Sequence, residues 1–409
     1  MRLRAVLVLC ALFPAAPLPA FEFPQWRGPA RDGRVSLPAR AAWPEALRAG
    51  WKVKVGVGHA SPVVSGDRVF LFSREGEEEV AQSFELATGK RVWRGAYPAP
   101  YTMNPAATSH GKGPKSTPVV ADGRLFTLGI SGILSSYDAT SGHLVWRKEF
   151  AGQFKETSPL YGTAMSPVVD GGVLIAHVGG HGDGALTAFD PATGAVRWAW
   201  KGDGPGYASP VVGTIGAVRQ IVTQSQDNVV GLSAEKGELL WRIPLTTAYE
   251  QNAVTPVLAG DLVIYGGLDQ PLRAVRVAKK GGAWTPERVW ENTEIATYLS
   301  SPVLEGGKLY GFSHRKRGQF FCLDAVTGRT LWLSDGRQAE SAAVLAGGGA
   351  LFLLTTDGAM IVAARDAPAF KPLRTWTVAE SATWAHPAVV DGALLVKDVD
   401  TLTLWRVPQ

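Results

Sequence analysis

Residues 138–146 read Asp-Ala-Thr-Ser-Gly-His-Leu-Val-Trp, and close copies of this segment return at residues 190–198 and 324–332. Looser copies occupy residues 85–93 and 233–241. The Asp and Thr side chains can bond nearby backbone amides and the glycine can take a positive φ, so each copy is expected to form a tight turn between strands. The tryptophan that ends each copy is suited to pack between neighbouring sheets.

A second motif, Ser/Thr-Pro-Val-Val/Leu, opens each repeating unit. Its six clear copies and two degenerate ones occupy residues 61–64, 117–120, 166–169, 209–212, 255–258, 301–304, 341–344 and 387–390. The proline positions give a mean period of about 47 residues. Four-stranded propeller blades repeat every 40 to 50 residues or so, and the motif therefore indicates a β-propeller.

The tryptophans and the chain ends give the number of blades. Seven units carry a tryptophan in the outermost predicted strand, namely Trp93, Trp146, Trp198, Trp241, Trp290, Trp332 and Trp376. The eighth unit, residues 387–407, has room for three strands only. Trp51–Val55 repeats the alternating pattern that follows those tryptophans, so we expect it to supply the missing strand. The prediction is all-β: one eight-bladed propeller of four-stranded antiparallel sheets over residues 51–409, closed without free edges.

Composition agrees with this fold class. Hydrophobic residues make up 46% of the 409 and charged residues 19%, with a mean hydropathy of +0.03, which excludes a disordered chain and a polytopic membrane protein. The 47 glycines and 27 prolines are more than usual and indicate many turns. Cys322 lies in an alternating run and is expected to be a buried strand residue.

The first 20 residues are expected to be a cleaved signal peptide. A basic start (Arg2, Arg4), a short apolar stretch and a small, proline-rich region follow one another. Leu9 precedes Cys10 where a lipoprotein signal needs a small residue, so the expected location is the periplasm or the exterior, without a lipid anchor. Residues 21–50 should form an arm over the outside of the propeller.

Net charge and hydropathy limit the kinds of partner that this chain is expected to bind. Without residues 1–20 the net charge falls from +5 to +3, and no long run of one sign appears, so nucleic acid is not an expected partner. No later stretch has 18 consecutive apolar residues, so no transmembrane segment is predicted. We expect a monomer.

The two repeat motifs together resemble the pyrroloquinoline quinone (PQQ)-type propeller repeat. The segments Phe23-Pro-Gln-Trp-Arg-Gly-Pro29, His110–Pro118 and Thr383–Pro387 are similar to elements of secreted bacterial proteins in this superfamily. The resemblance implies one of two branches. One holds PQQ-dependent alcohol or sugar dehydrogenases, and the other is non-enzymatic, typified by the outer-membrane-protein assembly factor BamB.

The dehydrogenase branch demands a site that the sequence does not display. PQQ needs stacking surfaces, cations, a calcium site of carboxylate and amide oxygens and an aspartate base. The adjacent cysteine pair of the alcohol dehydrogenases and a Cys-x-x-Cys-His haem motif are both missing from the sequence. We therefore expect a non-catalytic scaffold that binds a ligand or a protein, with no cofactor. The alternative is a quinoprotein dehydrogenase that holds PQQ with calcium.

One face of the propeller should carry the binding site, because the loops that lead into the innermost strands meet there around the channel. These loops contribute aromatic, cationic and amide groups: His59, His110, Lys112, Lys115, Tyr161, Tyr207, Gln251, Asn252, Tyr298, Glu340, Trp384 and His386. The loops between the middle strands add Arg74, His181, Asp183, Asp227, Asp269, His314, Arg315 and Asp398. The mixture suits a small anionic or sugar-like ligand, or an extended peptide.

From these loops we select Lys112, Lys115, Trp384, His386, His59 and Asp398 as candidate cofactor- or ligand-binding residues. No catalytic residue and no metal ligand is assigned. His177 and His181 are four apart but lie in a glycine-rich strand and turn, where that spacing does not place both on one helix face. Two alternatives remain open: solvated lysines, and histidines that bond carbonyls between blades. An envelope protein could also add a strand to a blade edge.

Overall fold

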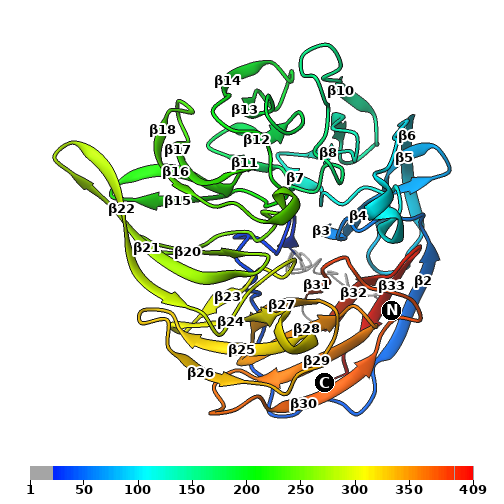
Figure 1. Cartoon of the computed structure of the whole chain (residues 1–409). Helices are drawn as coiled ribbons and strands as arrows, with labels where there is room; N and C mark the ends of the chain where they lie inside the picture. Colours follow the sequence, from blue (N-terminus) through cyan, green and yellow to red (C-terminus); the bar gives the residue numbers. More distant parts are fainter. Residues whose placement is uncertain (1–21, 391, 409) are drawn as a thin grey trace, which may run out of the picture.

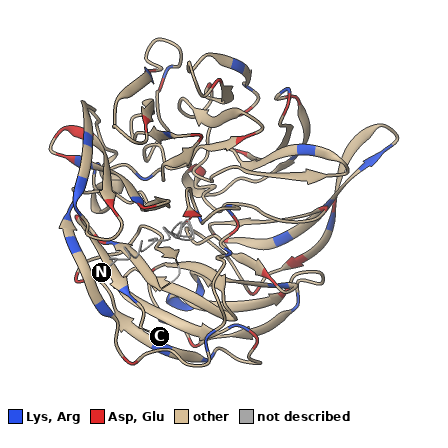
Figure 2. Ribbon diagram, turned by 180° about the vertical axis from the view of Figure 1, so that it is seen from behind, with Lys and Arg blue, Asp and Glu red and all other residues tan. Residues whose placement is uncertain are grey.

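Within residues 22–390 and 392–408, the computed structural model has eight antiparallel sheets arranged around a central axis (Figure 1). The predicted eight-bladed propeller is confirmed. Figure 2 shows basic and acidic residues interspersed around the ring. In this described part of the chain, no helix has the length and apolar character needed to cross a bilayer.

The blades follow one another along the chain, each from its innermost to its outermost strand. Blade 1 holds β3 (Val63–Ser65), β4 (Arg68–Glu75), β5 (Glu78–Glu85) and β6 (Arg91–Pro98). Blade 2 holds β7 (Val119–Ala121), β8 (Arg124–Leu128), β9 (Leu134–Asp138) and β10 (Leu144–Lys148). Blade 3 holds β11 (Val168–Asp170), β12 (Val173–Val178), β13 (Ala185–Phe189) and β14 (Val196–Trp200). Blade 4 holds β15 (Val211–Ile215), β16 (Val218–Gln224), β17 (Asn228–Ser233) and β18 (Leu239–Pro244).

The second half of the ring keeps this order. Blade 5 holds β19 (Val257–Ala259), β20 (Leu262–Gly267), β21 (Gln270–Lys280) and β22 (Ala283–Asn292). Blade 6 holds β23 (Val303–Glu305), β24 (Lys308–Ser313), β25 (Gln319–Asp324) and β26 (Thr330–Leu333). Blade 7 holds β27 (Ala342–Gly347), β28 (Ala350–Thr355), β29 (Ala359–Ala364) and β30 (Pro372–Thr377). Short 3₁₀ helices lie at Pro105–His110, Ala248–Glu250 and Arg315–Arg317.

The last blade joins the two ends of the chain, as predicted. Its strands are β31 (Ala388–Val390), β32 (Ala393–Lys397), β33 (Thr401–Arg406) and, outermost, β2 (Arg48–Lys54). Trp51 pairs with Leu404. The closing strand starts three residues earlier than expected, at Arg48. Cys322 is buried in β25, also as predicted.

The tryptophan–glycine pairs of the repeat join neighbouring blades. The Trp93 indole of blade 1 lies over Gly142 in the turn of blade 2, so close that a Cβ on Gly142 would come within 2.5 Å of the ring. The indole Nε1 donates a hydrogen bond of 2.9 Å to the carbonyl oxygen of Ala139 in the same turn. The same stacking recurs for Trp51 on Gly89, Trp146 on Gly194, Trp198 on Gly237 and Trp290 on Gly328. The repeat therefore encodes contacts between blades as well as the blades themselves.

Replacing Gly142 with alanine tests this stacking. Gly142 has φ +74°, so the variant suffers both left-handed strain and a clash with Trp93. We expect a loss of about 3 kcal/mol of unfolding free energy, measured by urea denaturation. Gly123→Ala is the matched control, because Gly123 has φ +72° and no atom within 4 Å of an added Cβ. It should lose only about 1 kcal/mol, and equal losses in the two variants would contradict stacking.

The Ser/Thr position of the opening motif forms a belt of hydrogen bonds around the axis. The backbone N–H of one blade donates to the hydroxyl of the next, from Thr117 to Ser166 at 2.9 Å and from Ser166 to Ser209 at 2.9 Å. Three more bonds of this kind run from the backbone N–H of Ser61 to the Thr117 hydroxyl, from that of Thr255 to Ser301, and from that of His386 to Ser61. The motif is visible in the sequence, but the role of its hydroxyls as hydrogen-bond acceptors between blades is not.

The expectation that the whole arm lies over the outside is wrong for its first part. β1 (Glu22–Phe23) pairs with β3 on the axial side of blade 1, and the chain that follows lies near the axis (Figure 1), where Arg27 bonds a carbonyl of blade 6 and Arg31 bonds carbonyls of blades 3 and 4. The Arg31 guanidinium donates to the carbonyl oxygens of Ser166, Pro167 and Pro210, each at 2.9 Å. Because arginine offers several donors in a fixed fork, it can bond carbonyls of two blades at once. This bonding holds the arm in the channel.

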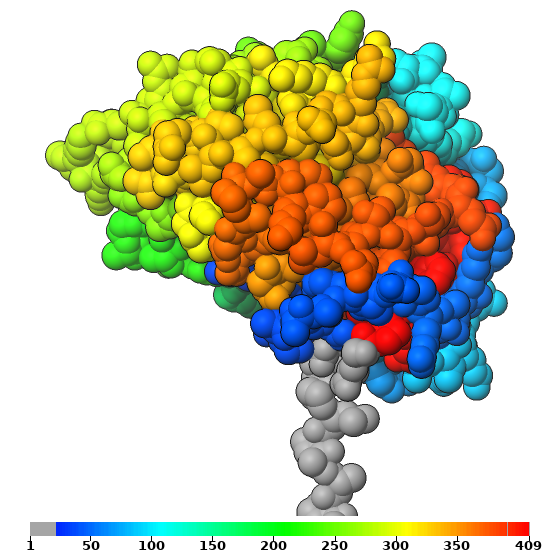
Figure 3. Space-filling view, turned by 90° about the horizontal axis from the view of Figure 1, so that it is seen from below, coloured from blue at the N-terminus to red at the C-terminus, as the bar shows by residue number. Residues whose placement is uncertain are grey.

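The later part of the arm does lie on the outside. Trp43 packs against Phe352 and Trp376 of blade 7, with ring centroids 5.4 Å and 6.3 Å away. Figure 3 shows the blue arm across the surface of the orange and red blades. The arm thus runs from the axis to the rim before it enters β2.

Candidate functional site

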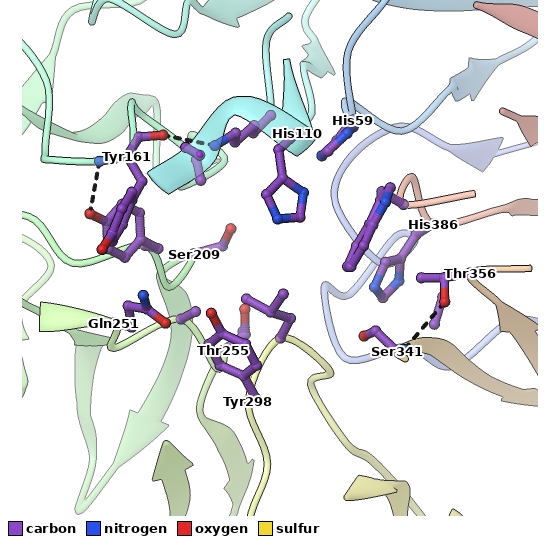
Figure 4. A pocket seen from close by; sticks show the side chains of 18 of the residues that line it. His59, His110, Tyr161, Ser209, Gln251, Thr255, Tyr298, Ser341, Thr356 and His386 are labelled. Atoms are coloured by element: carbon purple, nitrogen blue, oxygen red, sulfur yellow. Dashed lines mark hydrogen bonds between the residues drawn. The ribbon is translucent and has the colours of Figure 1, made fainter. Parts of the chain in front are cut away.

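A cavity of about 530 Å³ lies at the axis, on the face where the loops leading into the innermost strands meet (Figure 4). Side chains from every blade line it, and Trp26 of the arm forms part of its floor. The Trp26 Nε1 donates a hydrogen bond of 3.2 Å to the Thr255 hydroxyl. The channel is therefore a pocket with one open side, because the arm occupies the other.

Indole and imidazole rings form one wall of this axial pocket. The Trp384 ring stacks on His59, with centroids 5.8 Å apart and planes 20° apart. The His110 ring lies edge-on to the Trp384 ring, with centroids 4.9 Å apart. The rings of His386 and Trp26 are in contact, with centroids 4.3 Å apart. These rings come from the loops before blades 8, 1 and 2 and from the arm, so closure of the propeller assembles the wall.

Tyrosines form the opposite wall. Tyr161 and Tyr207 contact each other with centroids 6.0 Å apart, and the Tyr161 backbone N–H donates to the Tyr207 hydroxyl at 3.2 Å. Tyr298 also lines the pocket but lies between the two walls, next to Thr255 (Figure 4). The Lys115 ammonium donates to the Tyr161 carbonyl oxygen at 2.7 Å, which holds the lysine at the edge of this wall.

Neutral polar groups line the rest of the pocket. The hydroxyls of Ser209, Thr255, Ser341 and Thr356 and the amide of Gln251 all face the pocket (Figure 4). Ser209 and Thr255 are positions of the opening motif, so the belt of the inner strands also supplies the pocket with hydroxyls. The lining of the described residues includes no aspartate, glutamate or arginine.

Burial sets the charge of the pocket. Desolvation lowers the pKa of Lys115 to about 8, so its ammonium is still largely protonated at pH 7. Burial, together with the positive charge of Lys115, lowers the pKa of His59 to about 3. Burial also lowers the pKa of His386 to about 3 and, with Lys115, that of His110. At neutral pH the lining thus carries one positive charge among neutral rings and hydroxyls.

The structure brings four of the six selected residues into the pocket: His59, Lys115, Trp384 and His386. Lys112 lies outside the lining, with its Nζ 3.7 Å from the Glu77 carboxylate. Asp398 lies in the turn before β33, where its carboxylate accepts the backbone N–H of Thr401 at 2.9 Å. Sequence reasoning missed Trp26 and the Ser/Thr positions, although both belong to motifs that it recognised.

The loops between the middle strands build contacts outside the pocket. His314 Nε2 lies 2.9 Å from the Asp269 carboxylate, and His181 lies 3.5 Å from Glu250. His177 is buried in β12, beside the carbonyl oxygen of Asp203 at 3.1 Å. No group of three or more His, Cys, Asp or Glu residues suited to a metal ion occurs within the described ranges.

Comparison with solved structures defines the class of fold. BamB from Moraxella catarrhalis gives a TM-score of 0.64 at 15% identity, with 88% of this chain and 100% of that chain covered. Quinohemoprotein alcohol dehydrogenase from Comamonas testosteroni gives 0.66 at 15% identity, with 97% and 82% covered. The fold is therefore that of the PQQ-like β-propellers, which matches the resemblance of the repeats.

The sequence comparisons specify the family. The profile described as "Outer membrane protein assembly factor BamB" matches residues 76–334, more than half of the chain, and the chain belongs to this family. The BamB protein of Yersinia pestis is 23% identical over 302 residues, 69% of each chain. That of Burkholderia pseudomallei is 27% identical over 246 residues, 55% of this chain and 57% of its own length.

The axial pocket does not fit PQQ held with calcium. The rings of Trp384 and Trp26 could stack on a flat quinone, and Lys115 could pair with one of its carboxylates. PQQ carries three carboxylates, however, and a calcium ion takes six to eight oxygen ligands, several of them usually carboxylates. The lining offers a single ammonium and, among the described residues, no acidic side chain that could serve as calcium ligand or base.

Proposed function

We propose that this protein is a non-catalytic binding scaffold of the bacterial envelope that acts as a monomer. Residues 1–20, whose pattern supports export, lie outside the described residues. Membership of the BamB family supports a role in handling outer-membrane proteins. The propeller supplies a rigid ring for such a partner, and its axial pocket supplies a separate site for a small ligand.

One observation carries this proposal: the pocket at the channel mouth is built for binding and lacks the groups of a quinoprotein site. Aromatic rings, hydroxyls, an amide and one ammonium line it, and its described lining has no aspartate or glutamate to act as the base or the calcium ligand of a quinoprotein site. Of the three histidines in the described lining, His59 and His386 have pKa values of about 3, and burial lowers the pKa of His110 as well, so all three bind protons more weakly than a free imidazole.

Calorimetric titration of residues 21–409 with two ligands tests the proposal. An unfolded outer-membrane protein diluted from urea should bind with a Kd of roughly 1 μM, and an unfolded cytosolic protein of similar length is the control. PQQ with excess calcium should give neither heat nor a shift in melting temperature. Micromolar binding of PQQ, followed by dye-linked oxidation of an alcohol or sugar, would establish the dehydrogenase alternative instead.

A further inference from the structure

Several buried polar atoms around the axial pocket have no partner in the described chain. Gln251 Oε1 and His386 Nδ1 are buried without a hydrogen bond, and His386 is only 5% exposed. The Lys115 ammonium has three donors but makes one hydrogen bond, to Tyr161, and no ion pair among the described residues. The two remaining donor positions of the Lys115 ammonium are therefore suited to a polar ligand in the pocket.

The shape of the pocket indicates a ring. Flat faces stand on both sides, Trp384 and His59 on one and Tyr161 and Tyr207 on the other. A saturated ring can lay its C–H face on an aromatic side chain while its hydroxyls reach the serine, threonine and glutamine groups that line the rest of the pocket (Figure 4). The volume of about 530 Å³ lies in the usual range for small-molecule sites and has room for one or two such rings.

The charge of the pocket indicates one negative group on this ring. Lys115 is the single charged residue in the described lining at neutral pH, and its ammonium is largely desolvated. Glu340 acts on His110 and Tyr298 electrostatically but is exposed and lies outside the lining. A ligand carboxylate beside Lys115 would gain a charge-assisted hydrogen bond, which is roughly twice as strong as a hydrogen bond between neutral groups.

We propose that the axial pocket binds an acidic sugar, a hydroxyl-bearing ring with one carboxylate, with the carboxylate on Lys115 and the ring against Trp384. The hydroxyls of the sugar bond to Gln251 and to the serine and threonine side chains. This inference rests on the proposed function, in which the pocket binds and does not catalyse.

An extended peptide fits the same pocket less well. Peptides that bind by strand addition pair with backbone N–H and C=O groups along an open sheet edge. Here the groups that face the cavity are side-chain hydroxyls and ring faces, and Trp26 closes the floor. A long chain could therefore enter but not pass through, which favours a compact ligand.

The experiment titrates purified residues 21–409 with glucuronate, galacturonate and N-acetylneuraminate, with glucose and galactose as uncharged controls. Calorimetry and tryptophan fluorescence are the readouts, because Trp384 and Trp26 line the site. At least one acid should bind with a Kd of about 1 mM or tighter, and its uncharged counterpart about tenfold more weakly. An extended peptide without sugar, added in excess, should not displace the acid.

Two lysine variants separate the site from the rest of the protein. Lys115→Met should weaken binding of the acid about tenfold and leave the uncharged sugar unchanged. Lys112→Met is the matched control, since Lys112 lies three residues earlier in the same loop but outside the pocket, and it should bind like the parent. A Gln251→Leu variant should weaken both kinds of sugar, and melting temperatures report whether each variant is folded.

Three results would overturn the inference: no acid of the panel binds at about 10 mM, the uncharged sugars bind equally well, or Lys112→Met and Lys115→Met behave alike. Displacement by the peptide would assign the pocket to a polypeptide instead. The outer-membrane protein and PQQ titrations use the same preparation, so a failure with sugars alone leaves the proposed function standing, whereas PQQ binding would remove both.

Discussion

Replacing Arg31 with alanine should lower the free energy of unfolding by about 4 kcal/mol, because the variant leaves three carbonyl oxygens just before β11 and β15 without their donors. Arg31 is 3% exposed, and burial lowers its pKa to about 9, so the guanidinium remains charged at neutral pH. Hydrogen bonds from a charged donor contribute about 1.5–3 kcal/mol each, less the cost of burying the charge. Urea denaturation followed by tryptophan fluorescence measures the loss.

Arg34→Ala is the control on the same arm. Arg34 is largely exposed and pairs with Asp32, so its removal should cost less than about 1 kcal/mol. Because the arm carries Trp26, Arg31→Ala should also loosen the pocket floor and quench or shift the fluorescence of the folded state. If Arg31→Ala and Arg34→Ala unfold at the same urea concentration, the arm does not anchor in the channel.

The second large effect is acid destabilisation by buried histidines. Burial lowers the pKa of His177 to about 4 and of His386 to about 3, whereas an unfolded histidine titrates near 6.5. Between pH 6.5 and about 4 the unfolded chain therefore binds two protons at these positions that the folded chain does not, and His59, with a pKa of about 3, adds a third. The contribution of His177 and His386 to stability is complete above pH 6.5 and falls by about 3 kcal/mol per pH unit below it.

Urea midpoints measured from pH 7.5 to 4.5 should show this slope. The double variant His177→Gln/His386→Gln removes both groups and should make the profile about one third as steep, because His59, whose pKa burial also lowers to about 3, remains. His143→Gln is the matched control, because His143 is exposed in a turn, and it should keep the slope of the parent. A double variant that loses stability as steeply as the parent would show that other groups take up the protons.

The blades were predictable because their contacts are periodic. Trp93 meets Gly142 of the next blade, and the same pair of residue types recurs about every 47 residues, so the sequence repeats the packing that closes the ring. The arm has no such period. Its path depends on hydrogen bonds from Arg27 and Arg31 to carbonyl oxygens of blades 3, 4 and 6. These partners lie 135 to 275 residues away in the sequence, so no local pattern indicates them.

The sequence predicted which face of the propeller carries the pocket, but not which side chains line it in detail. The loops before the innermost strands do meet there, so His59, Lys115, Trp384 and His386 could be selected. Lys112 and Lys115 could not be separated, because the path of the loop after the 3₁₀ helix decides which lysine turns inward. The hydroxyls were missed because the Ser-Pro and Thr-Pro pairs looked like strand openings only.

Closure through β2 also sets an order of assembly during synthesis. The partners Trp51 and Leu404 are 353 residues apart, so at roughly 5–20 residues per second the ribosome finishes β33 about 20–70 s after β2. Blades 1 to 7 take their four main strands from continuous stretches of chain and can form as they emerge. β2 is the first long strand to be synthesised and the last to pair. Because its pairing with β33 is long-range and therefore slow, it should limit the rate at which the ring is completed.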